Sequence, residues 1–239
     1  MSEAAAIKKE LNKIRDPKKA DFLPKFFRAY PGGYGEGDLF LGINVPDQRK
    51  IARSHYRSIS LEELKDLMNS PYHEHRQTAL FILVYKYDRA GEEQEKKALV
   101  DFYLASLQSI NNWDLVDSSA SYILGQHLYE YKKDRTLLYR LAGSGELWKQ
   151  RIAVLSTFYF IKQGDFSDAL QIIDSLLNHD HDLIHKATGW MLREIGKRDY
   201  QTEFDFLKTR YREMPRTMLR YAIEKFDPAV RKKFLQGQI

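Results

Sequence analysis

Five polar residues stand at near-regular intervals along the 239-residue chain, and four of them are cationic. They are Arg76, Asp117, Arg151, Lys186 and Arg220, which are 41, 34, 35 and 34 residues apart. Cations repeated along one surface in this way would contact successive phosphates of a nucleic-acid backbone. A carboxylate within such a row repels phosphates. Asp117 therefore needs either a chemical role or a structural one, as the ion-pair partner of Arg151 or Lys186.

Two of the three tryptophans lie one helical turn from residues of this row. Trp113 is four residues before Asp117, and Trp190 is four residues after Lys186. Residues four apart share a face of an α-helix, so both indole rings would flank the groove that carries the carboxylate. A place in the core is the usual alternative for a tryptophan, and between repeats it is equally expected for Trp148.

The elements that must position these residues are helices. No proline occurs from Tyr72 to Met214, a stretch rich in Leu, Ala, Lys and Glu, and no segment shows the alternation expected of a strand. We predict helices over residues 3–14, 17–30, 46–57, 60–69, 73–88, 91–107, 112–130, 134–142, 146–162, 166–178, 182–196, 200–212, 215–226 and 227–235.

Each residue of the row opens an amphipathic helix that follows another helix, or lies early in one. A repeat of about 35–40 residues built from helix pairs is typical of an α-solenoid of the HEAT type. The predicted fold is therefore all-α: a single HEAT-like-repeat domain over 1–239, C-shaped, with a basic concave groove.

Composition narrows the function classes. Lys and Arg outnumber Asp and Glu by 38 to 33, giving a net charge of +5, which attracts a polyanion only if it gathers on one face. Cysteine is absent, which excludes disulfides, thiolate zinc sites and a cysteine nucleophile. No apolar run is long enough for a membrane span, and the N-terminus does not fit a signal peptide. We expect a monomeric cytoplasmic protein without membrane contact.

Four motifs resemble the AlkD-type DNA alkylation repair proteins, a family of HEAT-like-repeat DNA glycosylases, and the resemblance covers nearly the whole chain. The motifs are Phe40-Leu41-Gly42-Ile43 followed by Val45-Pro46, Trp113-Asp114-Leu115-Val116-Asp117, Trp148-Lys149-Gln150-Arg151, and Gly189-Trp190-Met191-Leu192-Arg193-Glu194.

The resemblance implies Asp117 as the catalytic carboxylate, Trp113 and Trp190 as groove aromatics, and Arg151 as the groove arginine. We assign Arg76, Lys186, Arg193 and Arg220 to further DNA contacts. One region of the chain departs from the family. The glycine-rich loop 30–39 is longer than in some members, and Asn44 and Val45 occupy the positions after Phe40-Leu41-Gly42-Ile43 at which polar residues can contact DNA.

The chemistry that this family performs needs few groups. Alkylation at N3 or N7 leaves a purine positively charged and weakens its glycosidic bond. A carboxylate such as Asp117, kept ionised by nearby cations, can stabilise the oxocarbenium-like sugar and position water. Indole faces attract the cationic nucleotide. We predict a monofunctional glycosylase that acts on alkylated bases in double-stranded DNA without metal or cofactor.

Two other function classes remain open: a non-catalytic HEAT-like-repeat protein that binds branched or distorted DNA, and a protein scaffold. The carboxylate with two tryptophans argues against both. The polar turn Asn178-His179-Asp180-His181-Asp182 and the pair His73 and His75 are interpreted as helix starts rather than metal sites, with Asp182 as the N-cap. The loop 32–37 lacks the Lys-Ser/Thr of a phosphate-binding loop, and Arg231-Lys232-Lys233 is interpreted as a solvated patch.

Overall fold

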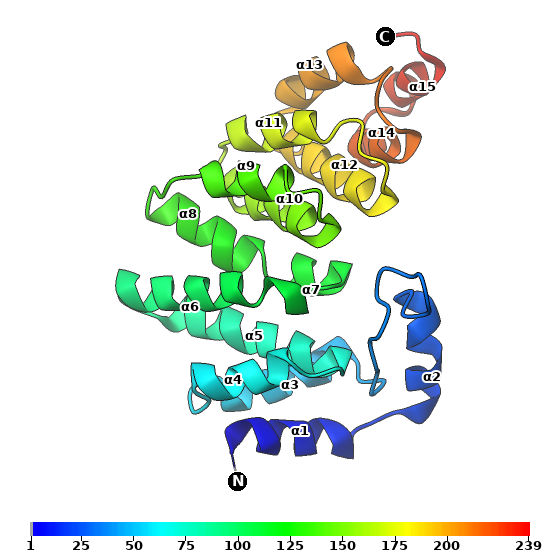
Figure 1. Ribbon diagram of the computed structural model, residues 1–239. Helices are drawn as coiled ribbons and strands as arrows, with labels where there is room; N and C mark the ends of the chain where they lie inside the picture. Colours follow the sequence, from blue (N-terminus) through cyan, green and yellow to red (C-terminus); the bar gives the residue numbers. More distant parts are fainter. Residues whose placement is uncertain (1) are drawn as a thin grey trace. The chain divides into compact units, whose positions relative to one another are not determined.

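The computed structural model describes residues 2–239, which form helices joined by loops (Figure 1). Within these residues the only β-type pairing is an isolated bridge between Leu39 and Tyr72, so the predicted all-α class is confirmed. None of the described helices is both long and apolar enough to cross a membrane. The chain divides into two compact units, Met1–Ser119 and Ala120–Ile239. The single domain over 1–239 and the C-shaped basic groove stay predictions.

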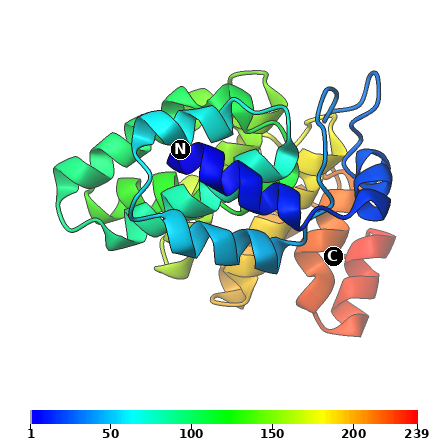
Figure 2. The same cartoon turned by 90° about the horizontal axis from the view of Figure 1, so that it is seen from below.

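Unit 1 is built around α5, which packs on α3, α4, α6 and α7. Figure 2 shows α1 lying over α3 and α4. Several of these helices start at a side chain that accepts a backbone N–H, among them Ser60 in a capping box. The helices are α1 (Glu3–Lys13), α2 (Pro17–Phe26), α3 (Val45–His55), α4 (Leu61–Met68), α5 (His73–Arg89), α6 (Glu93–Ala105) and α7 (Trp113–Asp117).

Unit 2 is built around α10 and α12. α10 packs on α9, α11 and α12, and α12 packs in turn on α13 and α14. A π-helix, Ser121–Gly125, opens the unit. The α-helices are α8 (Gln126–Glu130), α9 (Thr136–Ala142), α10 (Leu147–Lys162), α11 (Ser167–Ser175), α12 (Asp182–Gly196), α13 (Tyr200–Arg210), α14 (Arg216–Ala222) and α15 (Pro228–Gln236).

Most predicted helices are within a few residues of those observed, and 182–196 has both bounds of α12. The predicted helix 112–130 is wrong, because α7 ends at Asp117 and a turn separates it from the π-helix. The hydroxyl of Ser119 bonds the carbonyl of Leu115 at 2.6 Å, and such local bonds compete with a regular helix. The predicted helix 17–30 also ends early, at Phe26, because Arg28 takes a left-handed conformation (φ 49°).

Two glycines of the family-like motifs are required by close backbone approaches. Gly42 has a φ of +81°, and a Cβ there would lie 2.2 Å from the carbonyl oxygen of Asp16. Gly189 lies on α12 against α14, where a Cβ would stand 2.4 Å from the carbonyl oxygen of Met218. Both distances are far shorter than a van der Waals contact, so these positions exclude a side chain.

We predict that Gly189→Ala lowers the free energy of unfolding by about 1–3 kcal/mol or more, because α12 and α14 must separate to admit the methyl group. Urea denaturation followed by circular dichroism measures this effect. Gly91→Ala is the matched control, since nothing lies within 4 Å of its Cβ position. Equal stabilities of the two variants would contradict the packing argument.

Candidate functional site

Trp113 and Asp117 are the first and last residues of α7, and both are half-buried. The Asp117 carboxylate lies close enough to the fully buried Tyr103 to affect its ionisation. Burial raises the pKa of the Tyr103 phenol, and the negative charge of Asp117 acts in the same direction. The helix therefore carries a carboxylate and an indole ring one turn apart, as the sequence predicts.

Trp113 is the outer member of an aromatic stack. Its ring stacks on Phe27 with the centroids 5.6 Å apart, and Phe27 stacks in turn on Phe40 at 5.4 Å and on the His73 imidazole at 4.7 Å. Phe26, half of whose surface is exposed, meets the Trp113 ring edge-on at 6.0 Å. One side of Trp113 is thus fixed by packing, while the residue as a whole remains partly accessible.

The innermost member of this stack, His73, is the first residue of α5 and joins two carboxylates. Its Nδ1 lies 3.0 Å from Asp38 Oδ2, and its Nε2 lies 2.8 Å from Asp114 Oδ2. Both ring nitrogens must donate, so the imidazole carries a proton on each. Burial lowers the pKa of His73, but the charge and hydrogen bond of Asp114 and the hydrogen bond of Asp38 outweigh it and raise that pKa to about 9.

Arg76 belongs to the same cluster. Its guanidinium lies 2.6 Å from Asp38 Oδ1 and donates to the Ser70 carbonyl at 2.8 Å and to Asn111 Oδ1 at 3.0 Å. Burial raises the pKa of Asp38, but the hydrogen bond from His73 and the charge of Arg76 outweigh it, so the net pKa is lowered. Arg76 is 4% exposed. A DNA contact by Arg76 would require this ion pair to open, which argues against the predicted DNA contact of Arg76.

Glu74, the next residue of α5, holds the Phe40-Leu41-Gly42-Ile43 motif. Its buried carboxylate accepts the backbone N–H groups of Leu41 at 2.9 Å, Gly42 at 2.8 Å and Ile43 at 3.3 Å. The first turn of α5 therefore fixes this motif through Glu74 and α7 through His73. The carboxylate of Glu74 satisfies the buried N–H groups of the motif without water and so holds its backbone in this conformation.

In unit 2, Trp190 and Lys186 share α12 and both are half-buried. The indole N–H of Trp190 donates to Glu194 Oε1 at 3.2 Å, and its ring lies 5.7 Å from that of Phe158. Lys186 Nζ lies 2.6 Å from Asp182 Oδ2. Neither residue is simply core, because both keep accessible surface.

The other predicted cations of unit 2 differ in their surroundings. Arg151 on α10 is 4% exposed and donates to the carbonyl of Leu183 at 2.5 Å. Arg193 is ion-paired with Glu224. Arg220 on α14 is exposed, and within residues 2–239 it forms no ion pair. Their roles as DNA contacts stay predictions.

The histidine-rich turn before α12 is a helix start, but its N-cap differs from the prediction. His181 caps the helix through Nδ1, which accepts the Leu183 N–H at 3.1 Å, whereas Asp182 is the first helical residue. His179 Nε2 lies 2.9 Å from Gln150 Oε1. Across the part of the chain that the structure describes, no group of three or more His, Cys, Asp or Glu side chains is arranged to hold a metal ion.

The sequence matches the family model described as DNA alkylation repair enzyme over residues 7–226. The chain belongs to the DNA alkylation repair enzyme family. Membership confirms the resemblance to this family, and it places the protein in DNA repair with DNA as its substrate.

Two solved structures share the fold of this DNA alkylation repair family member. A predicted DNA alkylation repair enzyme from Enterococcus faecalis is 16% identical with a TM-score of 0.67, covering 90% of this chain and 97% of that one. The protein smu.31 from Streptococcus mutans UA159 is 17% identical with a TM-score of 0.55, covering 77% and 93%. No curated protein matches the sequence.

The sequence does not indicate the residues that support the site. It predicts a helix start at His73 and no role for Asp38, Glu74 or Asn111. One signal was present, because Asp114 lies inside the Trp113–Asp117 motif, where a second acid needs an explanation. Its partner, His73, is 41 residues earlier, and spacing along the chain does not indicate such a pair.

The His73 cluster predicts a specific alkaline loss of stability. The pKa of His73 is about 9 in the folded protein and near 6.5 in the unfolded chain. Its contribution is therefore complete below pH about 6.5 and is lost as the pH rises through 9. Between pH 7 and pH 10 the wild-type protein should therefore lose roughly 3 kcal/mol of its free energy of unfolding through His73. We expect the His73→Gln variant not to show this loss. Urea denaturation at both pH values measures it.

His75→Gln is the matched control. His75 is buried on the same turn, but burial lowers its pKa to about 4, so it does not titrate between pH 7 and 10. This variant should be destabilised equally at both pH values. A His73→Gln protein with the full alkaline loss of the wild type would show that the imidazole is not charged in the folded state.

Proposed function

We propose that this protein is a monofunctional DNA glycosylase that hydrolyses the N-glycosidic bond of cationic N3- or N7-alkylated purines. The observation that supports this most is the half-buried Asp117 on a helix that His73 and Asp114 hold in place. A carboxylate on a fixed support can face developing positive charge without reorganising.

The reaction asks little of the protein beyond that carboxylate. The alkylated base already carries a positive charge and departs as a neutral purine, so no strong general acid is needed. Asp117 would stabilise the positive charge that develops on the deoxyribose and orient the water that adds to it. Trp113 would present its accessible ring to the same sugar or cationic base.

Unit 2 supplies the other proposed contacts. Trp190 is assigned to the lesion nucleotide, and Lys186, Arg193 and Arg220 to backbone phosphates. Arg151 is also assigned to a phosphate, which it would reach only by releasing the Leu183 carbonyl, because it is buried. On binding, a phosphate would replace Asp182 as the partner of Lys186 and Glu224 as the partner of Arg193. Arg220 is exposed, so a phosphate could reach it directly. The proposal is of a cytoplasmic monomer acting on duplex DNA without a cofactor.

We predict that Asp117→Asn slows single-turnover release of 7-methylguanine from methylated duplex DNA by roughly 10²–10³-fold. The amide keeps the shape of the side chain but removes the charge that faces the sugar. Affinity for DNA should be equal or higher, because a carboxylate that repels phosphates is gone.

Trp113→Phe is the companion variant, because it keeps an aromatic ring on the Phe27 stack and should lose less activity than Asp117→Asn. Release at the wild-type rate by Asp117→Asn would refute the catalytic role. A wild-type protein that binds DNA but releases no alkylated base would instead support the non-catalytic alternative.

A further inference from the structure

Three arginines follow one another along one face at α3, outside the repeating row that the sequence indicates. Arg49, Arg53 and Arg57 are four residues apart, and the last lies just beyond the end of the helix. Between Arg49 and Arg53, which share a face of α3, this spacing corresponds to about 6 Å along the helix axis, and Arg57 lies in the turn that follows. Arg49 is half-buried, and Arg53 and Arg57 are exposed. We call these three residues the arginine row.

Each guanidinium of the arginine row lies over an aromatic ring rather than beside a carboxylate. Arg49 lies 4.0 Å from the centroid of Phe81 and Arg53 5.6 Å from that of Tyr85. Arg57 lies 5.4 Å from the centroid of Tyr56, at the hydroxyl edge of the ring, where its Nε donates to the Tyr56 hydroxyl at 2.9 Å. Within residues 2–239 none of the three forms an ion pair. This distinguishes the arginine row from Arg76, Lys186 and Arg193, whose charges are already met by carboxylates.

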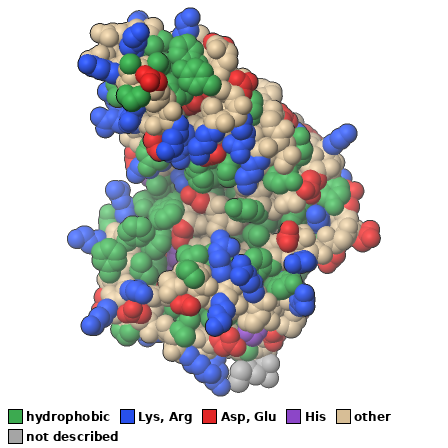
Figure 3. Space-filling view, turned by 180° about the vertical axis from the view of Figure 1, so that it is seen from behind, with side chains coloured by type: hydrophobic (Ala, Val, Ile, Leu, Met, Phe, Trp, Pro, Cys, Tyr) green, Lys and Arg blue, Asp and Glu red, His purple; other side chains and the backbone are tan. Residues whose placement is uncertain are grey.

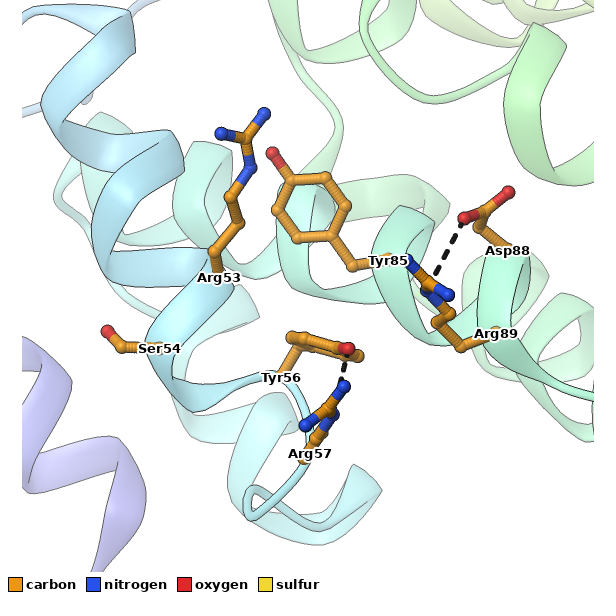
Figure 4. A pocket seen from close by; sticks show the side chains of 7 residues that line it. All are labelled: Arg53, Ser54, Tyr56, Arg57, Tyr85, Asp88 and Arg89. Carbon is orange, nitrogen blue, oxygen red and sulfur yellow. Dashed lines mark hydrogen bonds and ion pairs between the residues drawn. The ribbon is translucent and has the colours of Figure 1, made fainter.

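A cavity of about 530 Å³ opens beside Arg53 and Arg57 (Figure 4). Tyr85 lines it, and Figure 4 shows the Arg53 guanidinium close to the Tyr85 hydroxyl. This hydroxyl is buried and has no hydrogen-bond partner among the described residues. Arg89 adds a third cation, and the one acid lining the cavity is the exposed Asp88, 3.8 Å from Arg89.

In Figure 3, Lys and Arg side chains gather next to hydrophobic ones in the lower half of the view, with acidic side chains around them. Cations attract a polyanion, and the arginine row has no carboxylate partner to be displaced first; the counter-charge at the cavity is Asp88, which lies beside Arg89.

We infer that the arginine row binds the phosphate backbone of duplex DNA, with one phosphate seated in the cavity between Arg53, Arg57 and Tyr85. A guanidinium offers paired N–H donors that match phosphate oxygens, and its ring contact fixes its orientation before binding, which reduces the entropy lost. The unpaired Tyr85 hydroxyl supplies a further donor. This inference rests on the proposed action on DNA and adds a contact surface to it.

The arginine row is separate from the catalytic carboxylate. Ser118, the neighbour of Asp117, accepts a hydrogen bond from Gln77 of α5 at 2.7 Å, and Tyr85 lies eight residues beyond Gln77, which corresponds to about 12 Å along the helix. A contact at this distance affects how firmly DNA is held, not the chemistry at the sugar. Loss of the row should therefore change affinity while leaving the rate of base release from fully bound DNA unchanged.

The test compares wild-type protein with the triple variant Arg49→Gln, Arg53→Gln and Arg57→Gln on lesion-free duplex DNA, by fluorescence anisotropy between 50 and 200 mM salt. We expect affinity to fall about tenfold or more, and the slope of log affinity against log salt to fall by about 0.9 per lost contact. Single-turnover release at saturating methylated DNA should stay within about twofold of wild type.

The matched control removes the same charge elsewhere in unit 1, through Lys9→Gln, Lys13→Gln and Lys65→Gln at exposed positions of α1 and α4. It should keep most of the affinity and the slope. An equal loss in the control would mean that net charge alone is responsible, and an unchanged slope in the arginine variant would remove the row from the interface. Either result overturns the inference.

Two further measurements keep the test decisive. If the triple variant is unstable, Arg53→Gln alone should lower the slope of log affinity against log salt by about one. Tyr85→Phe keeps the ring beneath Arg53, so it should weaken DNA binding without changing the stability of the protein. Inorganic phosphate is titrated in parallel. Binding of free phosphate at the cavity without any effect of these variants on duplex affinity would assign the site to a small anion and refute a DNA contact.

The outcomes also separate this inference from the proposed glycosylase. If the protein needs the arginine row for DNA binding but releases no alkylated base, the inference stands and the proposed glycosylase activity is refuted. If base release depends on Asp117 but DNA affinity does not depend on the arginine row, the proposed activity stands and the inference is refuted.

Discussion

The candidate site depends on the pair of hydrogen bonds that join the charged imidazole of His73 to two carboxylates. A buried charge is costly unless its surroundings compensate it, and here two carboxylates, Asp38 and Asp114, accept its two N–H groups. The two carboxylates carry two negative charges, and Arg76, which lies beside Asp38, compensates the one that His73 does not; Arg76 also bonds Asn111. Removing one member would leave the others buried and unpaired, which is why such clusters behave as a unit.

The position of α7 follows from this cluster. A helix of five residues has almost no stability of its own, so it must be held by tertiary contacts. Asp114 bonds His73 from within α7, and Asn112 caps the helix at the N–H of Trp113. Trp113 is braced by the stack on Phe27. Asp117 is therefore presented by a short element whose orientation is set at several points, which suits a group that acts by charge and position.

The sequence predicts the helices well because apolar periodicity and the absence of proline are local signals. It fails at residues 118–120, where serine hydroxyls bond the backbone carbonyls of their own helix. It also predicts the positions of the repeated cations along the helices but not their surroundings. Arg76 and Arg151 both lie in the expected turns, yet both are buried and donate to backbone carbonyls. Spacing gives the register of a side chain, whereas its exposure depends on neighbours distant in the chain.

The sequence does not indicate the arginine row or the His73 cluster, because both depend on neighbours that are distant in the chain. Arg49 and Arg53 become distinctive only when α5 places Phe81 and Tyr85 beneath them, and His73 only when the loop and α7 bring in their carboxylates. In both cases the chemistry comes from residues more than 30 positions apart. The surroundings of a cation therefore come from such distant partners: Arg49 and Arg53 of α3 lie over aromatic rings, whereas Arg76 and Arg193 lie beside carboxylates.

The charge state of His73 tests the account most directly. Nitrogen-15 NMR of the imidazole ring, followed from pH 6 to pH 10.5, reports whether each ring nitrogen carries a proton. The account predicts that both Nδ1 and Nε2 of His73 are protonated at pH 7 and that the ring titrates near pH 9. A neutral His73 with a single protonated nitrogen at pH 7 would contradict the bridge between Asp38 and Asp114, and with it the fixed support of Asp117.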